Sequence, residues 1–172
     1  MKKISLLVIL LFIASTAFAA GGVAFIDLQK ALNLSNAGVK AKAEIGQQVK
    51  KFEAKVAAEQ DALKEMKKEL EKQAVLLSDD ARSKKEREFQ QRAKEFQRFT
   101  KDIQEELQQK DADFTKRIID EILKATREVS KEKGYDVVLE KSESSIIYGN
   151  PSVDLTDDVI KAYNASNWSV LL

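Results

Sequence analysis

Apolar side chains recur at helical spacing over most of the chain. In the first half of this stretch they alternate at steps of four and three, which is the heptad pattern of a helix that packs along one seam. Polar residues occupy two slots of the pattern, Glu59 and Gln73. The pattern predicts one long helix over residues 39–77. Its seam positions are Ile45, Val49, Phe52, Val56, Leu63, Met66, Leu70 and Leu77.

A second apolar series follows at close to the 3.6-residue period of a straight helix. Its positions are Phe89, Ala93, Phe96, Phe99, Ile103, Leu107, Phe114, Ile118, Ile122, Ala125 and Val129. The series lapses at Lys110 and Asp111. The run Leu77-Ser78-Asp79-Asp80 is the reversal point, because its serine can cap a new helix and its aspartates favour the positive helix end. We therefore predict an antiparallel helical hairpin over residues 39–133, with the polar lapses as places where an arm bends.

The start of the mature chain predicts a strand and a short helix. Val23-Ala24-Phe25-Ile26 is an apolar, β-prone run, and Asp27 after it is a natural N-cap for a helix over residues 28–34. Residues 35–38 contain cap and breaker side chains. They should separate this short helix from the long first arm.

The end of the chain predicts two more strands and a closing helix. Gly134 should end the second arm. The β-prone residues 135–140 should form a strand, and residues 145–148 should return as another after a polar turn. Thr156 is the expected cap of a helix over residues 157–163.

Three short strands make a sheet that is too small to be stable alone and that leaves exposed edges. We therefore expect self-association with cyclic symmetry. The fold class is α+β, with the hairpin 39–133 on a small body formed by residues 20–38 and 134–172. The apolar strand residues expected at the subunit interface are Val23, Phe25, Ile26, Val137, Val138, Leu139, Ile146 and Ile147.

The first residues have the three parts of a secretory signal. Met1-Lys2-Lys3 is basic, the apolar run 4–13 follows, and Ala17-Phe18-Ala19 is a cleavage motif. The apolar run is too short to span a bilayer. We expect cleavage near Ala19 and export to the periplasm, where a chain without cysteine carries neither a disulfide nor a lipid attached through a thiol.

Composition narrows the chemistry. The chain has no His and no Cys, which removes the commonest general bases, thiol nucleophiles and soft metal ligands. No glycine-rich loop precedes a helix to hold a phosphate. We therefore expect no enzyme, no cofactor and no metal. The 29 basic and 28 acidic residues become 27 and 28 after cleavage, so total charge does not select a partner.

Charge and exposed apolar side chains gather near the predicted tip of the hairpin. Arg82, Lys84, Lys85 and Arg87 are interleaved with glutamates, which is typical of a solvated helix face but also allows contact with an anionic membrane surface or an acidic partner. Nucleic acid is not expected for an exported protein. Val75 and Leu76 lie outside the seam, and we consider them, with the four basic residues, candidate contacts for an unfolded client or a membrane.

The whole arrangement resembles the Skp/OmpH family of periplasmic chaperones. The residues that carry the resemblance are the signal, the run Val23 to Lys30, the charged hairpin, the run Gly134 to Leu139, and above all Val153-Asp154-Leu155-Thr156-Asp157-Asp158-Val159-Ile160-Lys161. The resemblance implies a homotrimer with a central β-barrel body and three hairpin tentacles around a cavity. It also implies that unfolded outer-membrane proteins are held there without ATP, and that the tips contact anionic lipid or lipopolysaccharide.

The residues alone leave other functions open. A structural coiled-coil spacer of the cell envelope would use the same hairpin, but it would bind a folded partner. A module that binds membrane surfaces through residues 82–87 would lose its affinity steeply as salt is added. A nucleotide-independent holdase chaperone is the hypothesis that accounts for the hairpin and for the strands at both ends.

Overall fold

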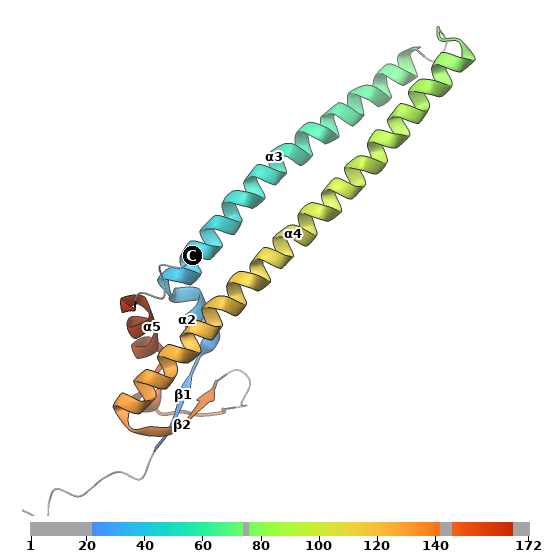
Figure 1. Cartoon of the computed structure of the whole chain (residues 1–172). Helices are drawn as coiled ribbons and strands as arrows, with labels where there is room; N and C mark the ends of the chain where they lie inside the picture. Colours follow the sequence, from blue (N-terminus) through green and yellow to red (C-terminus); the bar gives the residue numbers. More distant parts are fainter. Residues whose placement is uncertain (1–21, 74–75, 142–145, 167–172) are drawn as a thin grey trace, which may run out of the picture. The chain divides into compact units, whose positions relative to one another are not determined.

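The computed structural model describes residues 22–73, 76–141 and 146–166. The predicted signal segment, Val75 and the predicted turn before residue 146 lie outside these residues. The elements are β1 (Gly22–Ile26), α2 (Leu28–Leu34), α3 (Asn36–Gln73), α4 (Asp79–Lys133), β2 (Tyr135–Glu140), the 3₁₀ helix η1 (Pro151–Val153) and α5 (Thr156–Ala165) (Figure 1).

The chain divides into two compact units. The hairpin unit comprises residues 36–119, and the body unit comprises the described residues of 22–35 and 120–166. Helix α4 contributes to both units, its last residues belonging to the body. No helix among the described residues combines the length and the apolar character needed to cross a bilayer.

The hairpin unit consists of α3 and α4 up to residue 119, running antiparallel (Figure 1). The direction follows from their ion pairs, because Glu44 on α3 meets Lys110 whereas the later Glu59 meets the earlier Arg92. Helix α4 covers the predicted residues 79–133. The Oγ of Ser78 accepts a hydrogen bond from the Ala81 N–H at 3.4 Å, so the predicted cap is confirmed.

The predicted bounds of the first arm were wrong at both ends. Helix α3 begins at Asn36, three residues before the expected start at residue 39, because the helix break is confined to Ser35. Ser35 has an extended backbone, with φ −67° and ψ 151°, and Ala37, two residues later, is buried. At the other end the described part of α3 reaches Gln73, and Leu76 and Leu77 are no longer helical. The Gln73 carbonyl accepts hydrogen bonds from the N–H groups of Leu76 and Leu77 at 2.9 and 3.1 Å.

The seam of the hairpin is shallow. The buried apolar side chains of the hairpin unit, among the residues described, are Ala37, Ala41, Ile103 and Ile118. All other described seam positions of that unit are half-buried. Their apolar surface therefore remains partly accessible along both arms.

The body unit contains a two-stranded parallel sheet of β1 and β2. Val23 pairs with Val137 and Phe25 pairs with Leu139, after a register shift that follows Gly22. Gly134, with φ +75°, ends α4 in the left-handed conformation that glycine adopts without strain and lets the chain turn into β2.

The predicted third strand over residues 145–148 was wrong for its described part. Residues 146–148 join no sheet, and the side chains of Ile147 and Tyr148 are 102% and 82% exposed. The other edge of β1 is occupied further along the chain, where Asp154 forms a parallel bridge with Phe25 and the Leu155 N–H donates to the Phe25 carbonyl at 2.9 Å. Gly149, directly after residues 146–148, lies against the Phe25 ring of β1, so this segment leads across β1 to that bridge and does not run back along β2.

Candidate functional site

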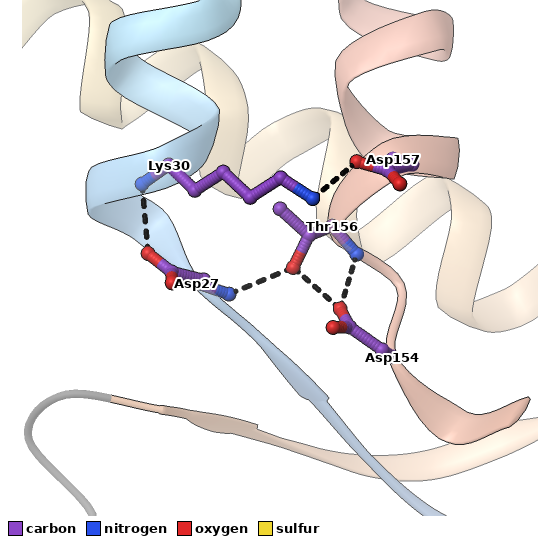
Figure 2. Close-up of polar contacts among 5 residues, drawn as sticks. All are labelled: Asp27, Lys30, Asp154, Thr156 and Asp157. Atoms are coloured by element: carbon purple, nitrogen blue, oxygen red, sulfur yellow. Dashed lines mark hydrogen bonds and ion pairs between the residues drawn. The ribbon is translucent and has the colours of Figure 1, made fainter. Parts of the chain in front are cut away.

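The acidic run Asp154–Asp158 fastens the two ends of the chain together, and we call it the clasp (Figure 2). The hydroxyl of Thr156, which is 0% exposed, accepts a hydrogen bond from the Asp27 N–H at 3.0 Å and donates one to Asp154 Oδ1 at 2.5 Å. The same Oδ1 accepts the Thr156 N–H at 2.9 Å. Both hydrogen-bonding roles of the hydroxyl are thus used where β1 ends.

The two aspartates at the start of α5 extend the clasp in two directions. Asp157 binds the Lys30 ammonium of α2 at 2.7 Å, and Asp158 binds that of Lys133, the last residue of α4, at 2.6 Å. Each hydrogen bond raises the pKa of its lysine above the ordinary value. The carboxylates also lie at the positive end of α5, and Lys133 lies at the negative end of α4, so both helix dipoles favour the pair.

The cap predicted for the closing helix was wrong. Thr156 is the first residue of α5, and Leu155 takes the N-cap position without a side-chain hydrogen bond. The Asp154 carboxylate, two residues earlier, accepts the first amide instead, which frees the Thr156 hydroxyl to reach β1.

A second buried contact ties α5 to the body part of α4. The Tyr163 hydroxyl donates to Glu121 Oε2 at 2.6 Å, and the two residues are 0% and 8% exposed. Burial, and then the hydrogen bond to the carboxylate, raises the pKa of Tyr163 well above its ordinary value. Only the protonated hydroxyl of Tyr163 can donate this hydrogen bond to the Glu121 carboxylate.

One face of the sheet is open. Paired residues share a face in a β-sheet, so Val23, Val137 and Leu139 lie together, and they are 55%, 46% and 39% exposed. We call these three side chains the open sheet face. On the same face Phe25 is only 7% exposed, because Gly149 approaches so closely that a Cβ there would lie 2.3 Å from the ring.

The residues predicted for a subunit interface are therefore not equivalent. Phe25 and Ile26 are already buried within the protomer, Val138 and Ile146 are half-buried, and Ile147 is fully exposed away from the sheet. On the opposite face of β2 from the open sheet face, Val138 helps to line a groove. The other side chains that line this groove are Leu123, Thr126, Arg127, Ser130, Lys131, Tyr135 and Asp136.

The residues predicted at the tip also differ in their environments. Leu76 is 84% exposed. Arg82 pairs with Glu86 at 2.9 Å, and Arg87 donates to the Ser83 hydroxyl at 3.0 Å, so both are engaged along their own helix. Lys84 is exposed. Their roles in binding a client or a membrane stay a prediction.

Three polar side chains at the lapses of the seam form contacts between the arms. Glu59 binds the Arg92 guanidinium through both oxygens, at 2.8 and 2.5 Å. The Lys85 ammonium donates to the Gln73 amide oxygen at 2.8 Å, and the Lys110 ammonium lies 2.8 Å from the Glu44 carboxylate. Sequence reasoning missed these contacts. Folding the sequence back at residue 78 and searching for opposite charges that face each other would have found the two ion pairs.

No cluster of acidic side chains in the described part of the chain is arranged to hold a metal ion. The close polar groups of the clasp satisfy one another: Asp154 is bonded to Thr156, and Asp157 and Asp158 are paired with lysines.

Residues 22–163 match the family described as outer membrane protein (OmpH-like). The chain therefore belongs to the OmpH-like family.

Individual relatives agree with this family. The chain is 31% identical over 155 residues to a Skp-like protein from Pseudomonas aeruginosa, covering 88% of this chain and 89% of the relative. It is 29% identical over 138 residues to an uncharacterized protein from Aquifex aeolicus, covering 80% and 83%. A crystal structure of an OmpH-like outer membrane chaperone from Caulobacter crescentus has the same fold, with a TM-score of 0.79, 23% identity and 86% coverage of each chain.

Proposed function

We propose that this protein is an ATP-independent holdase chaperone of the bacterial periplasm that binds unfolded outer-membrane proteins and keeps them from aggregating. The match to a Skp-like protein along about nine-tenths of both chains carries this proposal. The shallow seam supports it, because half-buried apolar side chains along both arms offer many weak contacts to an unfolded chain. Such contacts suit clients of varied sequence.

In this proposal the body assembles and the hairpins hold the client. Three copies join through their open sheet faces and strand edges into a β-barrel, and three hairpins surround a cavity. The apolar exposure of Val23, Val137 and Leu139 supports the assembly, since it costs free energy in a monomer and is recovered when a neighbouring copy covers it. The groove beside Val138 offers further surface next to the same strand.

The assembly is tested by two substitutions at strand positions that differ in burial. Val137→Lys places a charge on the open sheet face and should lower the mass in solution from three chains to one while the helical circular dichroism remains. Ile26→Lys, at a side chain that is 2% exposed, should unfold the protomer instead. A single-chain mass for the wild-type protein would overturn the proposed trimer.

The chaperone activity is tested with a barrel protein diluted from urea. The mature protein should suppress light scattering by this client without nucleotide. It should not bind a folded protein, so the association of that protein with its own partners should be unchanged. Unchanged scattering at several-fold molar excess of trimer would reject the proposal. Crosslinking only to a folded envelope protein would favour a spacer.

A further inference from the structure

A depression lies between the two arms near the middle of the hairpin unit. It is lined by Glu59 from α3 and by Arg92, Glu95, Phe96 and Phe99 from α4. Both phenylalanines are half-buried, so each ring offers part of its surface to the depression. The four residues of α4 span about two turns of that helix, opposite a single residue of α3.

The lapse in the seam creates this depression. Glu59 occupies a slot that the heptad pattern reserves for an apolar side chain, and both of its oxygens are bonded to Arg92. The carboxylate is therefore directed toward the guanidinium, and the rings of Phe96 and Phe99 line the depression beside it. The slot is lined by apolar surface but is not filled by it.

The charged side chains that line the depression favour a ligand of one charge over the other. The lining holds the carboxylates of Glu59 and Glu95 and the guanidinium of Arg92, a net charge of −1. Because Glu59 already binds Arg92, the excess negative charge lies with Glu95, which accepts only a neutral amide hydrogen bond from Gln91 at 3.1 Å among its contacts with described residues. A positive charge next to an inserted apolar side chain is therefore favoured.

We propose that this depression binds one apolar or aromatic side chain of an unfolded polypeptide, with a preference for segments in which lysine or arginine adjoins that side chain. The proposal deepens the holdase function and rests on it for the identity of the ligand. The rings of Phe96 and Phe99 supply the contact surface, and Glu95 supplies the preference for a cation.

Two dye-labelled, unstructured decapeptides test it, each with one tryptophan, flanked by lysines in the first and by glutamates in the second. Fluorescence anisotropy with the full mature protein should show tighter binding of the lysine peptide. Glu59→Leu fills the slot and should weaken this binding roughly two- to tenfold, the range expected for losing one aromatic contact. Glu59→Gln removes the charge without filling the slot and should keep most of the affinity for the tryptophan.

The matched control is Gln73→Leu, which fills the other α3 lapse, where Lys85 is the partner and where none of the lining side chains lies. It should leave peptide affinity unchanged. Glu95→Gln should reduce the difference in affinity between the lysine peptide and the glutamate peptide. Thermal melts show whether each variant is folded. Both leucine variants extend the apolar seam, so their melting temperatures should be no lower than that of the wild type.

The outcomes separate this site from the function on which it rests. Equal peptide affinity in wild type and Glu59→Leu, with suppression of client aggregation intact in both, overturns the site and leaves the holdase function standing. Peptide binding that Glu59→Leu weakens, in a protein that does not suppress aggregation, supports the site and rejects the holdase. A preference for the glutamate peptide overturns the assigned role of Glu95.

Discussion

The clasp predicts that a single hydroxyl determines much of the stability of the body. Thr156→Val keeps the shape of the side chain and removes its hydrogen-bonding capacity. The Asp27 N–H then loses its acceptor at 3.0 Å, and Asp154 loses the hydroxyl donor at 2.5 Å. Thr156 is 0% exposed, so a replacing water has no direct access in the native packing.

The cost follows from these two losses. A buried N–H without an acceptor costs about 1–3 kcal/mol, and a hydrogen bond to a charged carboxylate contributes about 1.5–3 kcal/mol. Asp154 keeps the Thr156 amide at 2.9 Å, so the second loss is partial. We expect Thr156→Val to lower the free energy of unfolding by about 3 kcal/mol, a large fraction of the 5 to 15 kcal/mol typical of a domain.

Thr156→Ser is the matched control. It keeps the hydroxyl and removes one buried methyl group, which costs about 1 kcal/mol. Urea unfolding followed by circular dichroism measures both variants, at one fixed protomer concentration because association adds to apparent stability. If valine and serine destabilise the protein equally, the hydrogen bonds of the clasp contribute nothing measurable and the reasoning is refuted.

Three further changes test other contacts. Gly149→Ala should destabilise the body by about 1–3 kcal/mol in urea unfolding, because its Cβ would lie 2.3 Å from the Phe25 ring; a neutral effect would mean that the ring moves aside freely. Gly46→Ala, whose Cβ would meet nothing within 4 Å in α3, should instead stabilise the protein by about 0.5–1 kcal/mol, and any loss of stability would contradict the open space at this helical position. The raised pKa of Tyr163 favours its protonated form in the folded state, so its contribution to stability is complete below about pH 10 and declines as the pH rises further. Tyr163→Phe should lower stability at neutral pH, because Glu121 loses its donor, and should flatten the alkaline decline; an unchanged alkaline slope would assign that decline to other groups.

The sequence was informative wherever a local rule decides the structure. The cap at Ser78, the length of α4 and the end of the helix at Gly134 each depend on residues within one or two turns, and they were predicted to the residue. The seam was predictable because apolar period and burial coincide along α4. The run Asp154–Asp158 was recognised as distinctive through its resemblance to a family, but local rules gave it only the role of a cap.

The errors arise where distant parts of the chain compete for one position. Residues 146–148 are β-prone, but the chain directly after them packs on β1, where Gly149 lies against the Phe25 ring and Asp154 bridges to Phe25. Thr156 is a good cap by local rules, but its hydroxyl accepts a hydrogen bond from the N–H of Asp27, which lies 129 positions earlier in the sequence. No pattern within a short window contains that information.

The polar lapses of the hairpin show why a defect in a pattern can be informative. Three of their side chains contact the opposite arm: Glu59, Gln73 and Lys110. That an arm bends at these places stays a prediction. Exposed ion pairs contribute only about 0.2–1 kcal/mol each, whereas burying a leucine contributes about 1.5–3 kcal/mol. Polar partners are therefore a poor way to strengthen the seam.

Polar partners are a good way to define the register of the two arms. An apolar seam tolerates sliding by a heptad, whereas sliding would separate Glu59 from Arg92. The hairpin thus gives up stability for a defined alignment, and at Glu59 the same exchange leaves apolar surface uncovered between the arms.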